Sequence, residues 1–268
     1  MKACANNPAY RSSSAVTPYL KESLMKIGII GAGNIGATLG MKLAASGHDV
    51  KIANSKGPDS LRALARELGA TAVSKEEALD DVEVIILSIP FSSYRELTCQ
   101  FLKVPRSTIV VDTSNYYPFR DGVISGIDGG IPESIWVELQ LGLPVIKAWN
   151  AALATTLAER GRPKGTGGRI AIPVSGDEPV AKAIIMELVE ETGFDTVDAG
   201  IISDSWRQQP GTPAYCTELA KDELIEALKS ADRLKAPVNR DRLIQEFMQS
   251  LSGATHDEIV ERNRTETT

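Results

Sequence analysis

The sequence reads MKIGIIGAGNIG over residues 25–36, and this stretch decides the fold. Residues 25–30 form a short apolar run of strand composition, and apolar residues then recur at helical spacing from Ile35 to Leu43. A strand that turns into a helix through closely spaced glycines usually holds the pyrophosphate of a dinucleotide. The stretch therefore predicts a nucleotide-binding unit at the start of the fold.

Each glycine of this stretch has its own geometric task. Gly31 allows a tight turn, and Gly33 lets the backbone approach phosphates with no side chain between them. Gly36 allows the helix to pack closely on the sheet. The first N–H groups of the helix, with the positive end of the helix dipole behind them, would then face the anion.

Composition places the chain among ordinary globular proteins. It has 268 residues, 43% hydrophobic and 24% charged, with a net charge of −6. The acidic balance argues against a nucleic-acid partner, and no apolar run approaches the ~18 residues that a membrane span needs. The 3 cysteines are far apart and belong to no Cys/His cluster, so we expect no metal site, no disulfide framework and a cytoplasmic location.

Residues 1–24 differ in composition from the rest of the chain. They are rich in Ala, Ser, Asn, Tyr and Pro, and they lack the continuous apolar core of a signal peptide. We interpret them as a disordered extension, or as the result of a start codon set too early, rather than as a targeting segment.

Strand-like and helix-like segments alternate from residue 25 onward. Strand-like segments lie at residues 49–53, 84–89, 107–112 and 144–148, and helix-like segments at residues 59–68 and 93–102. This alternation predicts an α/β fold, a doubly wound parallel Rossmann sheet with helices on both faces. We expect residues 25–150 to form the dinucleotide-binding domain.

A smaller α/β subdomain is predicted for residues 151–268, with a role in substrate binding and dimerisation. Before it, residues 114–132 form either a lid or a long crossover. The subdomain's expected elements are a helix at 151–160, a loop at 161–168, a strand at 169–174, a helix at 178–191, a strand at 194–197 and helices near 214–232, 238–251 and 255–263. The chain would therefore end in helices after a second βαβ-like unit.

The second strand of the predicted sheet ends in Asn54, Ser55 and Lys56. A site specific for NAD usually has Asp or Glu here, which accepts hydrogen bonds from the adenine ribose. An amide, a hydroxyl and an ammonium stand in its place, and Ser55 and Lys56 could bind a 2′-phosphate. This favours NADP(H). The alternative is that Asn54 and Ser55 only shape a turn and that Lys56 is a solvated charge.

Residues after the other strands are candidates for the nicotinamide end, because ligands of such sheets bind beyond the carboxyl ends of the strands. Ser88, Ile89 and Pro90 follow one strand, and Asn150 follows another. Pro90 could equally be a turn former.

The chain contains few groups suited to acid–base chemistry. Of its 2 histidines, His48 lies on the wrong side of the sheet and His256 lies in a tail expected to be exposed. Reduction of a ketone or imine leaves a charge that a proton donor must quench, whereas a flavin-like ring delocalises the charge. The small number of acid–base groups favours hydride transfer between two rings, in which the protein contributes mainly by positioning those rings. Lys147 and the tyrosines remain candidate donors, so no catalytic residue is assigned.

From about residue 25 to 200 the chain resembles the NADP-dependent coenzyme F420 reductase family, also called F420H2:NADP oxidoreductases. The resemblance rests on the segments IIGAGNIG (29–36), NSK (54–56), SIP (88–90), VIKAWN (145–150), VSGD (174–177) and VDAG (197–200). The VIKAWN segment is similar to the family's Lys-Ala-Phe-Asn segment with Trp in place of Phe. The cytosolic, flavin-using domain of metalloreductases shares several of these segments.

The resemblance implies a Rossmann domain followed by a smaller domain, a homodimer, and a deazaflavin stacked against the nicotinamide. Carried over by position, Ala32, Gly33, Asn34 and Ile35 would hold the pyrophosphate, Ser55 and Lys56 the 2′-phosphate, and Ile89 and Pro90 the nicotinamide end. The motif and the resemblance together predict these cofactor-binding residues: Gly31, Ala32, Gly33, Asn34, Ile35, Gly36, Asn54, Ser55, Lys56, Ser88, Ile89, Pro90 and Asn150.

The chain departs from the family's pattern after Gly200. Trp206 and Tyr215 could stack on a ring, and Arg207 could meet an anionic tail, so we predict these as substrate-binding residues. A folded interface loop is the alternative interpretation of this segment. The predicted partner is a small-molecule hydride acceptor, either coenzyme F420 or a flavin-like compound.

Two other functions stay open. A β-hydroxyacid dehydrogenase or imine reductase would need a proton donor over the nicotinamide and a glycine-rich motif leading into a catalytic helix. Residues 161–168 are glycine-rich, but a strand-like segment follows them. A non-catalytic NADP(H) sensor would bind the nucleotide and reduce no acceptor.

Overall fold

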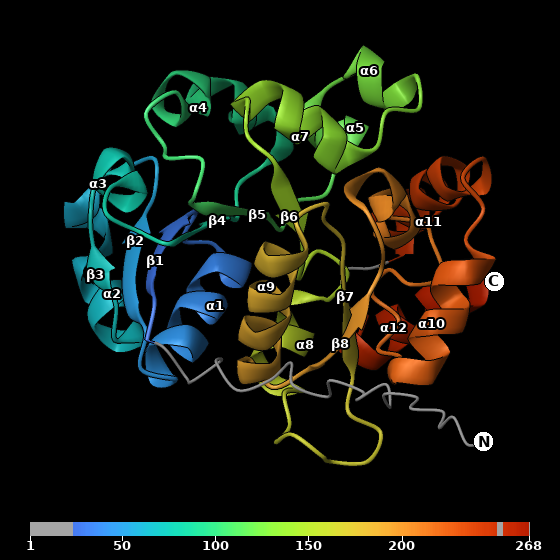
Figure 1. Ribbon diagram of the computed structural model, residues 1–268. Helices are drawn as coiled ribbons and strands as arrows, with labels where there is room; N and C mark the ends of the chain where they lie inside the picture. The colour runs from blue at the N-terminus through green and yellow to red at the C-terminus, as the bar shows by residue number, and fades with distance from the viewer. Residues whose placement is uncertain (1–23, 251–253, 268) are drawn as a thin grey trace, which may run out of the picture.

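The computed structural model describes residues 24–250 and 254–267 of the chain (Figure 1). The predicted disordered extension, residues 1–24, therefore lies almost wholly outside the described residues.

Six parallel strands form the central sheet, in the order β3-β2-β1-β4-β5-β6 (Figure 1). The strands are β1 (Lys26–Ile30), β2 (Asp49–Ala53), β3 (Thr71–Ala72), β4 (Val84–Leu87), β5 (Ile109–Asp112) and β6 (Val145–Lys147). Ile30 lies beside Ala53 of β2 and Leu87 of β4, so the tips of these three strands reach the same level. The strand order reverses between β1 and β4, where ligands of open α/β sheets bind. The predicted Rossmann sheet is confirmed.

Helices cover both faces of this sheet. They are α1 (Asn34–Ala45), α2 (Arg62–Leu68), α3 (Lys75–Leu79), α4 (Tyr94–Phe101), α7 (Glu133–Leu141), α8 (Ala154–Glu159) and α9 (Pro179–Glu191), with the short 3-10 turns η1 (Pro58–Leu61) and η2 (Phe91–Ser93). No helix in the described part of the chain combines the length and the apolar composition needed to cross a bilayer.

Local sequence signals set several of these helix ends. Helix α3 begins at a reciprocal cap, in which Ser74 and Glu77 each bond the other's backbone N–H through the side chain. Helices α2 and α7 end at Gly69 and Gly142, whose φ angles of 72° and 69° lie in the left-handed region that favours glycine.

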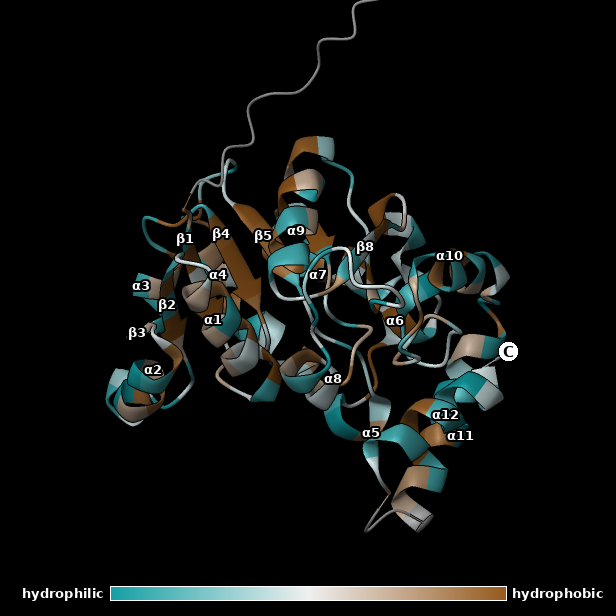
Figure 2. Cartoon of the chain, turned by 90° about the horizontal axis from the view of Figure 1, so that it is seen from below, coloured by the Kyte–Doolittle hydropathy of each residue, from teal (hydrophilic) through white to brown (hydrophobic). Residues whose placement is uncertain are grey.

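Alternate strand residues face two separate hydrophobic cores. Ile27 and Ile29 of β1 belong to the cluster that includes α1, α2, α8 and α9, whereas Ile30 belongs to the cluster of α3, α4 and α7. A strand covered on both faces needs a continuous apolar run, and Val84–Leu87 is one. In Figure 2, β4 and β5 are accordingly coloured as hydrophobic bands between helices.

A second, two-stranded parallel sheet follows, made of β7 (Ala171–Val174) and β8 (Asp195–Asp198), with α9 between the two strands in sequence. It adjoins the edge of the main sheet, because Lys147 and Ser175 exchange both backbone hydrogen bonds in an antiparallel bridge. Ile146 and Ile172 share one core cluster. Side chains on both sides of the predicted domain boundary at residue 150 therefore pack together, and the boundary itself stays a prediction.

The remaining elements are α5 (Pro118–Asp121), α6 (Ser125–Asp128), η3 (Ile202–Gln208), α10 (Lys221–Ser230), α11 (Lys235–Ser250) and α12 (His256–Thr267). The segment 114–132, predicted as a lid or crossover, thus contains two short helices.

One prediction for the C-terminal region is wrong in a helix boundary and another in the burial of a side chain. The helix expected near 214–232 is present as α10, but it begins at Lys221, because Cys216 and Glu218 have φ angles of 56° and 50°, which a right-handed helix does not allow. His256 was expected in an exposed tail. It begins α12, its side chain is largely buried, and its Nε2 lies 2.6 Å from Glu218 Oε1.

The two glycines of α1 predict opposite effects of added methyl groups. A Cβ on Gly36 would lie 1.9 Å from the carbonyl oxygen of Gly31, so Gly36→Ala should lower the free energy of unfolding by about 1–3 kcal/mol. A Cβ on Gly40 would meet side chains at 3.6 Å or beyond, so Gly40→Ala should raise it by about 0.5–1 kcal/mol. Urea unfolding of both variants measures these changes, and equal effects would contradict the packing described.

Candidate functional site

A cavity of about 390 Å³ opens at the carboxyl edge of the main sheet. Its lining comprises Ile30, Gly31, Ala32, Gly33, Asn54, Ser55, Lys56, Lys75, Ser88, Ile89, Pro90, Ser93, Glu96 and Leu97. The structure thus brings together the glycine turn, the tip of β2 and the residues after β4. Among the predicted cofactor-binding residues, Asn34, Ile35, Gly36 and Asn150 do not line this cavity.

The glycine turn is built from close backbone approaches. Gly31 has a φ of 111°, and a Cβ there would lie 2.0 Å from the carbonyl oxygen of Ser88. Gly36 leaves equally little space beside Gly31. Gly33, in contrast, has nothing within 4 Å of an added Cβ. Gly31 and Gly36 therefore allow main-chain segments to pack closely on one another, whereas Gly33 leaves open space at the cavity.

The first turn of α1 is open toward an anion. Gly33 occupies the N-cap with no side-chain hydrogen bond, and the turn contains no acidic residue. Asn34 is exposed there, and Ile35 is partly buried. Uncapped N–H groups at the start of a 12-residue helix are a favourable position for a phosphate.

The tip of β2 combines a turn with exposed polar groups. Asn54 Oδ1 accepts a 2.8 Å hydrogen bond from the backbone N–H of Lys56, and Asn54 Nδ2 donates to Ser60 at 3.0 Å. Asn54 therefore shapes the turn, as the alternative interpretation held. The turn leaves Ser55 and Lys56 exposed on the cavity wall.

Strands β5 and β6, which follow β4 in the order of the sheet, end in a buried ion pair. Asp112 and Lys147 are neighbours in the register, and their side chains are fully buried with Nζ 3.0 Å from Oδ2. Asp112 also accepts hydrogen bonds from Tyr94 Oη and Ser134 Oγ, both at 2.7 Å, and from Ser114. Burial opposes its charge, but Lys147 and these donors hold the pKa of Asp112 below its ordinary value.

Glu133, at the start of α7, is a third member of this ionic group. Its carboxylate lies 3.5 Å from Lys147 Nζ, and its buried Oε2 makes no hydrogen bond within the described chain. Burial raises the pKa of Glu133 to about 7; Lys147 opposes the rise, and Asp112 adds to it. The sequence shows a helix-starting Pro132-Glu133, but local pattern carries no sign that this carboxylate is buried.

Asn150, which follows β6, does not line the cavity. Its Nδ2 donates to Asn115 Oδ1 at 3.0 Å and to the Gln208 carbonyl at 2.8 Å, while its Oδ1 accepts from Gln208 Nε2 at 2.9 Å. The amide is thus fully engaged in joining the loops after β5 and β6 to η3.

Trp149 is a buried anchor of the same loop. It has a φ of 57°, uncommon for a non-glycine residue, and its side chain is fully buried. Its Nε1 donates to Thr192 Oγ1, just after α9, at 3.2 Å. The indole therefore ties the loop after β6 to the second α/β unit.

The predicted substrate-binding residues form internal contacts instead of lining the cavity. The Arg207 guanidinium lies 4.5 Å from the centre of the Trp206 ring and donates to the Leu228 carbonyl of α10. Tyr215 Oη lies 2.6 Å from Tyr117 Oη. Their assignment to substrate binding stays a prediction.

Both histidines are engaged away from the cavity. His48 accepts from the backbone N–H of Met25 at the amino end of the sheet, and its Nε2 lies 2.6 Å from Glu191. His256 pairs with Glu218. Within the described residues, no group of three or more His, Cys, Asp or Glu side chains is placed to hold a metal ion.

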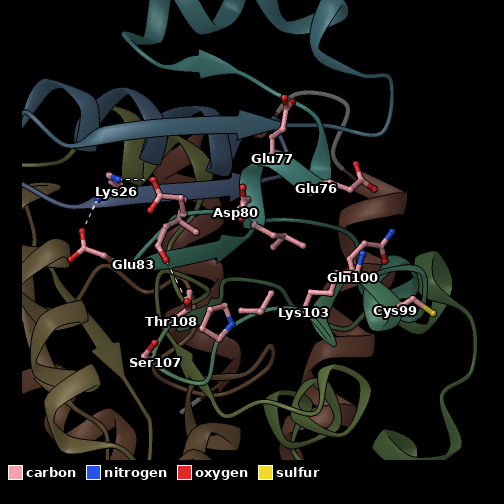
Figure 3. Close-up of a pocket in the computed structure, with 15 residues that line it drawn as sticks. Lys26, Glu76, Glu77, Asp80, Glu83, Cys99, Gln100, Lys103, Ser107 and Thr108 are labelled. Atoms are coloured by element: carbon pink, nitrogen blue, oxygen red, sulfur yellow. Dashed lines mark hydrogen bonds and ion pairs between the residues drawn. The ribbon is translucent and has the colours of Figure 1, made fainter.

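A larger hollow of about 940 Å³ lies at the amino edge of the sheet (Figure 3). Lys26, Glu83 and Thr108, which precede or begin strands, are part of its lining, and Lys26 is paired with Asp81 at 2.6 Å. Parallel α/β sheets bind ligands at the opposite, carboxyl edge. We therefore assign the functional site to the smaller cavity.

The buried carboxyl of Glu133 predicts a pH-dependent stability. Because folding raises its pKa from 4.5 to about 7, the stabilisation from its proton is complete below the lower value and is lost as pH rises through the higher one. The free energy of unfolding of the wild type should therefore fall by up to about 3 kcal/mol from this group between about pH 5 and pH 8, and Glu133→Gln should not show this fall. Urea unfolding at both pH values measures the free energies. The exposed Glu67→Gln is the control, and parallel pH profiles for wild type and Glu133→Gln would contradict the prediction.

Comparisons with known proteins agree with this geometry. The family model described as NADP oxidoreductase coenzyme F420-dependent matches residues 26–116. The Escherichia coli (strain K12) protein YjhV is 38% identical over 102 residues, which are 38% of this chain and 74% of YjhV. The crystal structure of SMa0349, a hypothetical protein from Sinorhizobium meliloti, is 33% identical, with 75% of this chain and 98% of that chain covered and a TM-score of 0.64.

A provisionally named F420-dependent NADP-reductase from Arthrobacter sp. FB24 shares the fold. It is 22% identical, with 68% of this chain and 87% of that chain covered and a TM-score of 0.55. On the match to this family model, the chain belongs to the coenzyme F420-dependent NADP oxidoreductase family and is an NADP-dependent oxidoreductase.

Proposed function

We propose that the cavity at the tips of β1, β2 and β4 binds NADP(H), and that the protein exchanges a hydride between this nucleotide and a ring acceptor such as coenzyme F420 or a flavin. One observation carries the proposal. A single cavity joins the glycine turn, the carboxylate-free tip of β2 and the Ser88–Pro90 segment.

The glycine turn fits a pyrophosphate. The open space at Gly33 leaves room for the phosphate oxygens, and the uncapped first turn of α1 offers N–H donors with the helix dipole behind them. Gly31 and Ala32 form the adjoining wall. In this proposal Asn34 and Ile35 contribute backbone N–H groups, and Gly36 acts by letting the helix lie close to the sheet.

The tip of β2 fits the additional phosphate of NADP(H). Asn54 holds the turn, and the turn presents the Ser55 hydroxyl and the Lys56 ammonium at the cavity wall. A hydroxyl and an ammonium donate charge-assisted hydrogen bonds to a phosphate, whereas a carboxylate at this point would repel it.

The segment after β4 would hold the nicotinamide end. Pro90 occupies the N-cap of η2 in an extended conformation, with a φ of −57° and a ψ of 146°, and it lines the cavity together with Ser88 and Ile89. Bound NADPH would supply a hydride from its nicotinamide ring. The residues of this chain would contribute by positioning that ring against the acceptor.

The placement of the acid–base groups supports a ring acceptor. Both histidines lie away from the cavity, and Lys147 is fully buried in its ionic group. Burial and the neighbouring Asp112 raise the pKa of Tyr94 well above its ordinary value. A ring that delocalises the transferred charge can take its proton from water.

An acceptor comparison tests this function. We expect NADPH to be oxidised when F420 or FMN is added, and not when hydroxyacid oxidation products or cyclic imines are added. Turnover with a ketone or imine alone would instead support a carbonyl or imine reductase. Tight NADPH binding with no acceptor reduced would support a sensor.

We also propose a homodimer in the cytoplasm. Exposed apolar side chains near the carboxyl end of α11, Phe247 and Met248, offer a surface for a second copy, and the free thiols Cys99 and Cys216 fit a reducing compartment. Analytical ultracentrifugation should give twice the mass of the chain.

A carboxylate at the tip of β2 should change the nucleotide preference. Ser55→Asp would place a negative charge beside the 2′-phosphate, so we expect NADPH affinity to fall about tenfold or more while NADH affinity is spared. Calorimetric titration with each nucleotide measures this. Ser107→Asp, at the amino edge, is the charge-matched control. Equal losses for both nucleotides would refute the role of Ser55.

A further inference from the structure

A second lysine faces the cavity from the next strand along the sheet. Lys56 follows β2, and Lys75 begins α3 just after β3. Because β3 lies beside β2 at the edge of the sheet, the two lysines approach the cavity from neighbouring strand ends. The predicted cofactor site contained Lys56 and did not contain Lys75.

Neither ammonium has a partner elsewhere in the described chain. Lys56 is exposed and Lys75 is partly buried, and neither side chain makes a hydrogen bond or an ion pair with another described residue. Two like charges beside one cavity repel each other. An anion in the cavity would relieve this repulsion.

The acids nearest to Lys75 in sequence do not neutralise it. Glu77 bonds the backbone N–H of Ser74 in the helix cap. Glu76 and Glu77 both line the hollow at the amino edge, as Figure 3 shows, whereas Lys75 lines the cavity at the carboxyl edge. The lysine of helix α3 therefore lies at the carboxyl edge of the sheet, whereas its two glutamates lie at the amino edge.

The one carboxylate of the cavity comes from the other side. Glu96 belongs to α4, which follows β4, and the sheet order places β4 beyond β1 from the two lysines. The lining therefore has its positive charge at the β2–β3 end and its negative charge on the β4 side. A dinucleotide whose additional phosphate lies at the adenosine end matches this polarity.

We propose that Lys75 is a specificity-determining residue that contacts the 2′-phosphate of NADP(H) from the β3 side, together with Ser55 and Lys56 at the tip of β2. The inference rests on the proposed function, which places the adenosine end at the tip of β2. Lysine binds phosphate as a point charge, so its contribution should depend on charge and on ionic strength.

Binding of adenosine fragments tests this contact without the nicotinamide. We expect Lys75→Gln to weaken binding of 2′,5′-ADP and of NADPH about tenfold, and to leave 5′-AMP and NADH within about twofold of the wild type. Lys75→Arg should retain most of the affinity for 2′,5′-ADP. The difference in 2′,5′-ADP affinity between the wild type and Lys75→Gln should shrink at high salt, since screening weakens the charged contact that only the wild type makes.

Lys103→Gln provides the matched control, because it removes the same charge from an exposed position at the amino edge. The control should bind all four ligands as the wild type does. Calorimetry gives the affinities, and thermal unfolding of each variant checks that the fold is retained.

Unchanged 2′,5′-ADP affinity in Lys75→Gln would overturn the proposal. Equal weakening of 5′-AMP and 2′,5′-ADP would also overturn it, because Lys75 would then contact a part that both ligands share. A wild-type protein that binds neither NADPH nor 2′,5′-ADP would instead show that the proposed function is wrong, and the role of Lys75 would fall with it.

Discussion

The close approach of three backbone segments at the tip of β1 positions everything else at the site. The Gly31 Cα faces the carbonyl of Ser88, and the Gly36 Cα faces the carbonyl of Gly31, with no room for a methyl group at either position. This contact sets how closely the first turn of α1 lies to the sheet. It also brings the ends of β1 and β4 to one wall, so the cavity follows from the packing of main chain on main chain.

A second constraint acts at the neighbouring strand ends, where the ionic group of Asp112, Lys147 and Glu133 lies inside the protein. The parallel register places Asp112 and Lys147 side by side, so each charge meets its partner as soon as β5 and β6 pair. Removing one member of such a buried pair commonly costs about 3–5 kcal/mol, because an uncompensated charge stays behind. The group therefore makes the correct pairing of these strands a strict requirement.

Local sequence pattern was sufficient for the features that local geometry determines. The turn at Gly31, the buried run at Val84–Leu87 and the carboxylate-free tip at Ser55 are all contained in a few consecutive residues, and the sheet follows from their alternation with helices. The spacing of apolar residues and the composition of each segment indicate these strands, helices and turns directly.

The remaining features depend on contacts between distant segments. Lys75 and Lys56 are 19 positions apart in the numbering and line one cavity because β3 pairs with β2. Glu133 is buried because α7 places it against Lys147. The predicted start of the helix over 214–232 was wrong for a related reason: the backbone at Cys216 follows its hydrogen bond to Ala151 and not its own helical propensity. No window of local sequence contains these partners.

The anchoring of Trp149 has a consequence for motion. Its indole lies in the core shared by the main sheet and the β7–β8 unit, and its Nε1 donates a hydrogen bond to Thr192, which follows α9. A hinge opening between these two parts would have to withdraw the indole and leave a void of its size, at a cost of about 3–5 kcal/mol. We therefore expect the two sheets to move together as a single body.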